Sequence, residues 1–98
     1  MEFAPAIIDK LRERAAHFDA LTEQLSQPEV ASDGKRLAEL MRERGQLESS
    51  HALCQRMEGL LAREEEANAI LADESEDQEF LDLARADLEA AEEEALSL

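Results

Sequence analysis

Apolar residues recur at intervals of three and four along the first part of the chain. The positions that share this spacing are Ile8, Leu11, Ala15, Phe18 and Leu25. Because about 3.6 residues make one helical turn, their side chains lie on one face of a helix. The sequence predicts a helix over about 5–26. Pro5 suits a first helical position, and Pro28 disfavours helical backbone at Gln27, the residue before it.

A second apolar pattern returns every seven residues, at Leu40, Leu47, Cys54 and Leu61. Such a return keeps side chains on one helix face, so this segment is suited to pack lengthwise on other helices. Its start lies behind Ser32 and Asp33, either of which can accept a hydrogen bond from the unpaired N–H groups of a first turn. We predict one long helix over about 34–72.

The third pattern has a clear start signal, because Ser75 and Gln78 have the spacing of a capping box. Glu76 and Asp77 lie where the helix dipole favours negative charge. The apolar seam that follows consists of Leu81, Ala84, Leu88, Ala91, Ala95 and Leu98. These features predict a helix over about 76–97.

The three predicted helices differ in length. At about 1.5 Å per residue the middle helix would span ~58 Å and each of the others ~32 Å, so the short helices fit nearly end to end along the long one. Folding back through the turns pairs Leu21 with Leu40 and Ala91 with Met57. Strand-forming residues are scarce, with Val once, Ile three times, Thr once and 3% aromatic residues. We predict an all-α fold in a single domain over residues 1–98: an elongated antiparallel three-helix bundle with one long central helix and two shorter helices packed along it.

The net charge of −15 is unevenly distributed, because residues 64–98 hold fourteen acidic side chains and only Arg85 as a base. This part should repel phosphate backbones, which disfavours direct nucleic-acid binding. One interpretation is a solvated helix face, and the alternative is a surface for basic proteins. The single cysteine, the lack of a signal-peptide pattern and the lack of a run of about 20 apolar residues predict a cytoplasmic protein without membrane contact.

No arrangement of side chains in the sequence predicts chemistry. His51 and Cys54 are three residues apart, but two ligands do not make a metal site, and His17 should lie about 10 Å away. Cys54 is better explained as a small core residue. The acidic runs point around their helices, and the three glycines are scattered. We therefore predict no catalytic residue, no cofactor, no metal site and no enzymatic activity. Weak self-association through the seven-residue pattern stays an alternative.

Three stretches carry a family resemblance: IIDKLRERAAHFDALTEQLSQPEV, ASDGKRLAELMRERGQLES and EEEANAILADESEDQEFLDLARADLEAAEEE. Their order resembles the N-terminal domain of bacterial class I peptide chain release factors, in particular the type for UAA and UAG codons. In that family a first helix ends in a Leu-Ser-x-Pro-Glu-Val-like turn, and a long second helix ends in an Asp-rich turn before an acidic third helix. Gly45 departs from the family pattern, where an aromatic residue is common, and should leave the helix locally underpacked.

The resemblance implies a function in translation termination on the ribosome. Family members have further domains that read the stop codon and carry a Gly-Gly-Gln motif, and neither that motif nor a codon-reading tripeptide occurs in these 98 residues. The resemblance therefore implies the first domain alone, a docking module without catalytic motifs that acts through proteins at the stalk base of the large subunit. The competing hypothesis is a stand-alone acidic helical adaptor or coiled-coil interaction protein with no ribosomal link.

Overall fold

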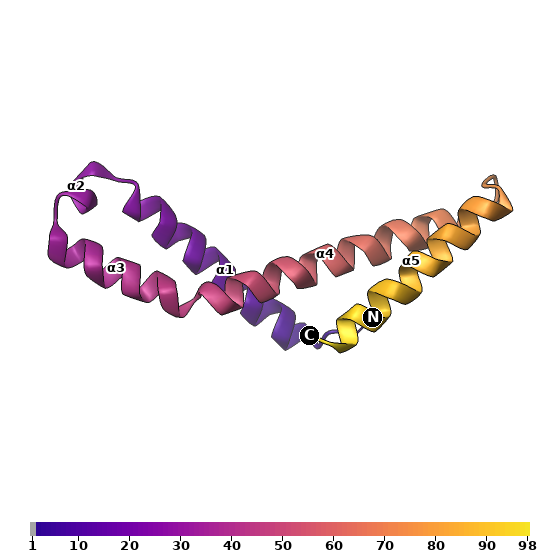
Figure 1. Cartoon of the computed structure of the whole chain (residues 1–98), viewed down its shortest axis with the longest axis horizontal. Coiled ribbons are helices and arrows are strands. Elements are labelled where there is room, and N and C mark those ends of the chain that lie inside the picture. The colour runs from indigo at the N-terminus through magenta and orange to yellow at the C-terminus, as the bar shows by residue number, and fades with distance from the viewer. Residues whose placement is uncertain (1) are drawn as a thin grey trace. The chain divides into compact units, whose positions relative to one another are not determined.

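The computed structural model describes residues 2–98, and its regular elements in that range are all helices (Figure 1). They are α1 (Pro5–Leu25), α2 (Pro28–Ala31), α3 (Gly34–Gln46), α4 (Glu48–Leu71) and α5 (Gln78–Leu96). The predicted all-α class is confirmed. The chain divides into two compact units, Phe3–Cys54 and Gln55–Leu98, and α4 begins in the first and continues into the second.

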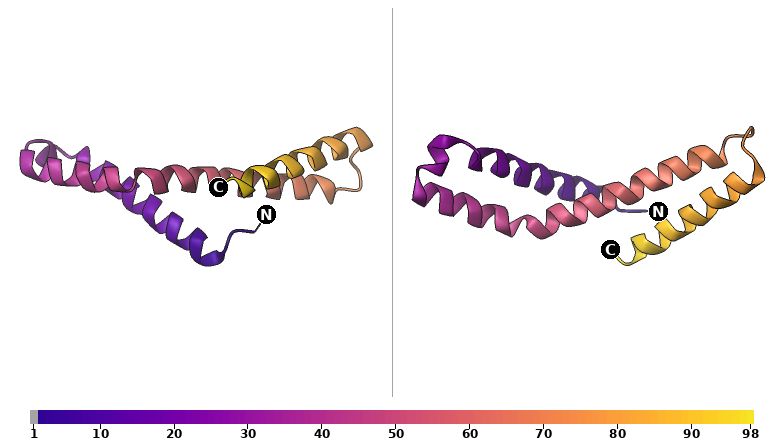
Figure 2. Two further views of the ribbon diagram at one scale, coloured as in Figure 1. Left: turned by 60° about the horizontal axis from the view of Figure 1, so that its bottom comes forward. Right: turned by 45° about the horizontal axis from the view of Figure 1, so that its top comes forward.

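In the first unit, α1 and α3 lie side by side and run antiparallel, with α2 in the connection between them (Figures 1 and 2). Phe18 and Leu21 on α1 and Val30 on α2 are buried, and Leu40 on α3 is half-buried. The apolar face predicted for the first helix therefore faces the interior of this unit. Burying such side chains is the main favourable contribution to packing helices against one another.

The short helix α2 was not predicted, because four residues are too few to show an apolar period. Pro28 both ends α1 and starts α2. Gln27 before it has extended backbone, with φ −80° and ψ 133°, as a residue that precedes proline prefers. Pro28 then stands in the first turn, where its missing N–H is not needed. The carbonyl of Gln27 accepts from the N–H groups of Val30 at 3.1 Å and Ala31 at 3.0 Å.

The predicted single helix over 34–72 is wrong, because the structure has two helices, α3 and α4, that meet at Leu47. Leu47 has φ −97° and ψ −4°, and its N–H bonds to the carbonyl of Arg44 at 3.1 Å, three residues back. This tighter bond is typical of a helix end. Gly45 lies just before it, and no side chain from elsewhere stands within 4 Å of the place where its Cβ would be. Glycine weakens a helix, but Gly59, with equally open surroundings, lies inside the continuous helix α4, so glycine alone does not explain the interruption.

The second unit is a hairpin in which α5 runs antiparallel along α4, as both views in Figure 2 show. The buried side chains of α4 in this unit are Met57, Leu60 and Ala67, and those of α5 are Ala84 and Ala91. Leu81, Leu88 and Ala95 are half-buried. The seam predicted for the third helix is therefore confirmed from 81 to 95, whereas Leu98 lies beyond the end of α5 and is 38% exposed.

The predicted capping box at the start of the third helix is wrong. The N-cap of α5 is Asp77, whose carboxylate accepts a hydrogen bond from the N–H of Phe80 at 2.8 Å. Asp is as good an N-cap as Ser, and its negative charge also interacts favourably with the helix dipole. Gln78 instead donates to Asp82 within the helix. By contrast, one of the two candidate caps for the second pattern is confirmed, because Asp33 caps α3 and accepts from the N–H of Arg36 at 3.2 Å.

Ser75 is bound to Asp73 in the turn between α4 and α5. Its hydroxyl donates to the Asp73 carboxylate at 2.6 Å and its N–H at 2.9 Å. These bonds, the hydroxyl first, lower the pKa of Asp73 below the ordinary aspartate value. A lowered pKa in the folded state contributes stability that is present above the unfolded pKa and lost as the pH falls through the folded pKa.

Replacing Ser75 by alanine should raise the pKa of Asp73 toward its ordinary value, because the stronger of the two bonds is removed. A titration of the Asp73 carboxyl carbon by NMR measures this change. Ser26→Ala is the control, since the Ser26 hydroxyl donates only to a backbone carbonyl. An unchanged pKa of Asp73 in Ser75→Ala would show that the hydroxyl bond does not form in solution.

Candidate functional site

The side chains that could in principle bind a metal or act as nucleophiles lie in separate surroundings. Over residues 2–98, no group of three or more His, Cys, Asp and Glu side chains is placed to hold a metal ion. His17 lies beside Glu43, with Nε2 3.0 Å from the carboxylate. Cys54 is buried, as predicted for a small core residue, and His51 stacks on an aromatic ring.

The first unit contains an aromatic and polar cluster around Phe18. The rings of Phe18 and His51 stack with centroids 4.0 Å apart and an angle of 26° between their planes. The guanidinium carbon of Arg44 lies 4.2 Å from the Phe18 centroid, which is a cation–π distance. Arg44 Nε also donates to Thr22 Oγ1 at 2.7 Å, and that hydroxyl donates to the Phe18 carbonyl at 3.0 Å.

This cluster joins α1 to α3 and to the first turns of α4, and all of its members belong to the first unit. Sequence reasoning missed it, although one signal was present. Thr22 stands where the apolar spacing of the first helix would place another apolar residue. Thr22 is itself exposed, and its hydroxyl accepts a hydrogen bond from Arg44, which links α1 to α3. The cluster links the packed helices of this unit through aromatic and polar contacts.

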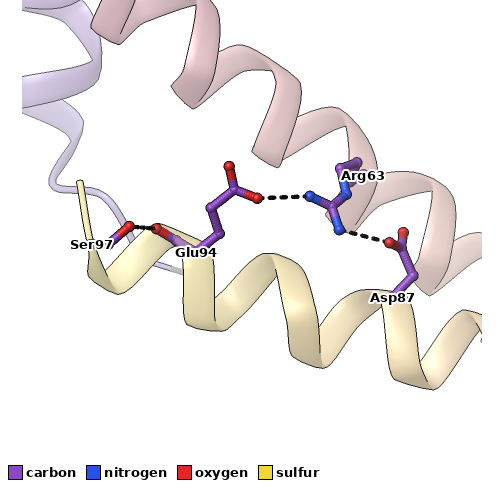
Figure 3. A network of polar contacts seen from close by, with 4 residues as sticks. All are labelled: Arg63, Asp87, Glu94 and Ser97. Atoms are coloured by element: carbon purple, nitrogen blue, oxygen red, sulfur yellow. Dashed lines mark hydrogen bonds and ion pairs between the residues drawn. The ribbon is translucent and has the colours of Figure 1, made fainter.

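The second unit presents an acidic surface on α5, and one basic side chain of α4 binds part of it. Arg63 donates to Asp87 at 2.7 Å and to Glu94 at 3.1 Å, so its guanidinium bridges two carboxylates about two turns apart on α5 (Figure 3). The pKa of Arg63 is raised above its ordinary value. The largest cause is the hydrogen bond to Asp87, and the negative charge of Asp87 and the hydrogen bond and charge of Glu94 add to it. The Ser97 hydroxyl donates to the Glu94 backbone carbonyl at 2.7 Å.

The remaining carboxylates of α5 face solvent. Glu89, Glu92 and Glu93 are exposed, and they lie off the buried seam that holds α5 against α4. Changing their charge should therefore leave the hairpin folded. We define these three residues as the acidic face, which is one exposed part of the negative surface.

Comparisons with known proteins identify relatives of this chain. The family model described as the PCRF domain matches residues 14–98. A curated protein of Agathobacter rectalis, named peptide chain release factor 1, is 32% identical over 92 residues, which is 94% of this chain and 25% of that protein. The chain thus spans about a quarter of the length of this relative. No solved structure matches the chain. Within the described part of the chain, every helix is too short or too polar to cross a membrane.

Proposed function

Because the chain belongs to the PCRF domain family, we propose that it is the N-terminal helical domain of a peptide chain release factor that acts on the ribosome at UAA and UAG codons. The family match over residues 14–98 is the observation that carries the proposal. The relative from Agathobacter rectalis supports the choice of factor type, since its name is peptide chain release factor 1. The proposed setting is the cytoplasm.

The role we propose for these residues is docking, through the acidic face, on basic proteins at the stalk base of the large ribosomal subunit. Residues 64–98 hold fourteen acidic side chains and one basic one. Such a surface is repelled by ribosomal RNA and attracted by basic proteins, which raises the rate of association more than the affinity. Sequence-specific contacts with nucleic acid are not part of the proposed role.

We expect the 98-residue chain to release no peptide from ribosomes programmed with UAA or UAG. Its sequence contains no Gly-Gly-Gln segment, the motif that the family resemblance associates with peptidyl-tRNA hydrolysis. The measurement is hydrolysis of labelled peptidyl-tRNA, with an intact release factor on the same ribosomes as the positive control. Codon-dependent release by the chain itself would contradict the proposed division of roles.

Reversing the charge of the acidic face, by Glu89→Lys, Glu92→Lys and Glu93→Lys together, should slow association of the chain with ribosomes about tenfold at low salt. Electrostatic attraction is screened as the Debye length falls from ~10 Å at 0.1 M to ~3 Å at 1 M salt, so the difference from the unaltered chain should shrink at high salt. Stopped-flow fluorescence of a labelled chain mixed with ribosomes measures the association rates of the variant and of the unaltered chain at each salt concentration.

The matched control reverses three exposed carboxylates of the first unit, Glu13, Glu23 and Glu39. It changes the net charge by the same amount but leaves α5 untouched. Equal slowing by both variants would show that net charge, and not the acidic face, sets the rate. An unchanged rate for the α5 variant at low salt would leave the acidic face a solvated surface only.

A further inference from the structure

A groove of 190 Å³ lies on the α4–α5 hairpin, lined by residues of both helices. Its lining includes two small residues of the buried seam, Ala67 and Ala84, which are 3% and 6% exposed. Beside them stand two large apolar side chains that remain accessible, Phe80 at 43% and Leu83 at 63% exposure. The hairpin thus keeps alanines at its helix–helix contact and leaves larger apolar surface along the groove.

The dimensions of the groove indicate which kind of ligand it can take. Pockets for cofactors and other small molecules usually measure about 300–1,000 Å³, so this groove is too small for most of them. Its volume suits one or two apolar side chains from a larger partner. Two helices packed side by side also present a groove along their contact in which a third helix can lie. Helix-in-groove binding uses anchors of this kind, spaced along one face of an amphipathic helix.

The charge of the surrounding surface indicates which classes of partner can bind the groove. Glu66 and Asp87 belong to the lining, and Asp87 is shared with Arg63 while Glu66 is exposed. The surrounding residues 64–98 carry one basic side chain against fourteen acidic ones. Nucleic acids and anionic membranes would be repelled by this surface. A second copy of the chain would bring an equally acidic hairpin, so self-association through the groove is also disfavoured.

We propose that the groove binds a basic amphipathic helix of a partner protein. An apolar anchor of that helix lies between Phe80 and Leu83, and Lys or Arg side chains flanking it lie near Glu66 and the other carboxylates of the hairpin. Apolar contact supplies affinity, and charge selects basic helices over acidic ones. This inference goes beyond the proposed function, because it requires no ribosome and no other domain.

The test uses a synthetic helical peptide of Leu and Lys, about 18 residues long so that it is stably helical, and measures its binding to the chain by fluorescence anisotropy. Leu83→Gln should weaken binding about tenfold or more, because the variant loses most of the apolar contact with the anchor. Met41→Gln is the matched control, since Met41 is 59% exposed and belongs to the other unit. It should bind the peptide as the unaltered chain does.

Two further peptides separate apolar contact from charge. A Lys–Ser peptide of the same charge should bind about tenfold more weakly than the Leu–Lys peptide, and a Leu–Glu peptide should bind more weakly still. Equal binding of the Lys–Ser peptide, equal loss in Met41→Gln, or full affinity in Leu83→Gln would overturn the proposal. Far-UV circular dichroism checks that Leu83→Gln remains folded, and Leu83→Ala, which favours helix, serves as the second variant.

Sedimentation of the chain alone tests whether a second copy of the chain occupies the groove. The chain should be monomeric with or without Leu83→Gln. A dimer that Leu83→Gln abolishes would show that the groove is covered by a second copy, which would overturn the proposed partner. Because no ribosome enters these measurements, their failure leaves the release factor proposal untouched, and failure of the ribosome experiments leaves the groove proposal untouched.

Discussion

Replacing Phe18 by alanine should lower the free energy of unfolding of the Phe3–Cys54 unit by about 3 kcal/mol. Phe18 is 8% exposed, and both the His51 ring and the Arg44 guanidinium contact its ring. The substitution removes buried apolar area, leaves a cavity, and takes away the stacking and cation–π contacts together. A unit this small has little stability to spare, so a loss of this size should leave it largely unfolded.

Urea unfolding followed by circular dichroism measures the total loss, and amide hydrogen exchange shows where in the chain it falls. Exchange should accelerate along α1 and α3, which the cluster joins. Ile7→Ala is the control on the same helix, since Ile7 is 55% exposed and its truncation removes little buried area. If Phe18→Ala costs no more than Ile7→Ala, the cluster does not hold the first unit together.

The faces of the helices could be predicted from the sequence because apolar spacing is a local property. The seam from Leu81 to Ala95 and the inward face of α1 both follow from spacings of three and four residues. The interruption at Leu47 could not be predicted in the same way. A single glycine costs only about 1 kcal/mol in a helix, and Gly59 is accommodated inside α4, so the presence of Gly45 does not by itself predict an interruption.

The sequence also could not predict which of two suitable residues would cap a helix. Ser75 and Asp77 both stand near the start of α5, and both residue types are good N-caps. The structure uses Asp77, which accepts from the N–H of Phe80, while Ser75 donates to Asp73 in the preceding turn. Local patterns rank such candidates poorly when two of them lie within three residues.

For the candidate functional surfaces too, some features could be predicted from the sequence and others depend on how the helices pack. The acidic character of the last helix is visible in its composition, but the bridge from Arg63 to Asp87 and Glu94 depends on the register of α5 against α4. The apolar groove did leave a signal in the sequence. Phe80 and Leu83 are large apolar residues that do not belong to the predicted seam. Apolar side chains off a buried seam have to remain exposed or be covered by a partner.

Replacing Met57 by alanine should cost about 3 kcal/mol of the free energy of unfolding, with the loss concentrated in the Gln55–Leu98 unit. Met57 and Val30 are the largest fully buried side chains of the described residues, and Met57 is 1% exposed. Most other buried side chains of the hairpin are alanines, which contribute little buried area each. Repacking around the lost side chain is therefore limited, because small neighbours cannot extend to fill the cavity.

The sequence offers a control of the same chemistry, Met41→Ala, because Met41 is 59% exposed. Both substitutions exchange methionine for the best helix former, so differences in helix propensity cancel and the remaining difference reports burial. Met41→Ala should change the free energy of unfolding by less than about 0.5 kcal/mol. Amide exchange in Met57→Ala should accelerate along α5 as well as α4, since each helix of the hairpin is held mainly by packing on the other. Equal losses in the two variants would show that burial of Met57 does not stabilise the hairpin.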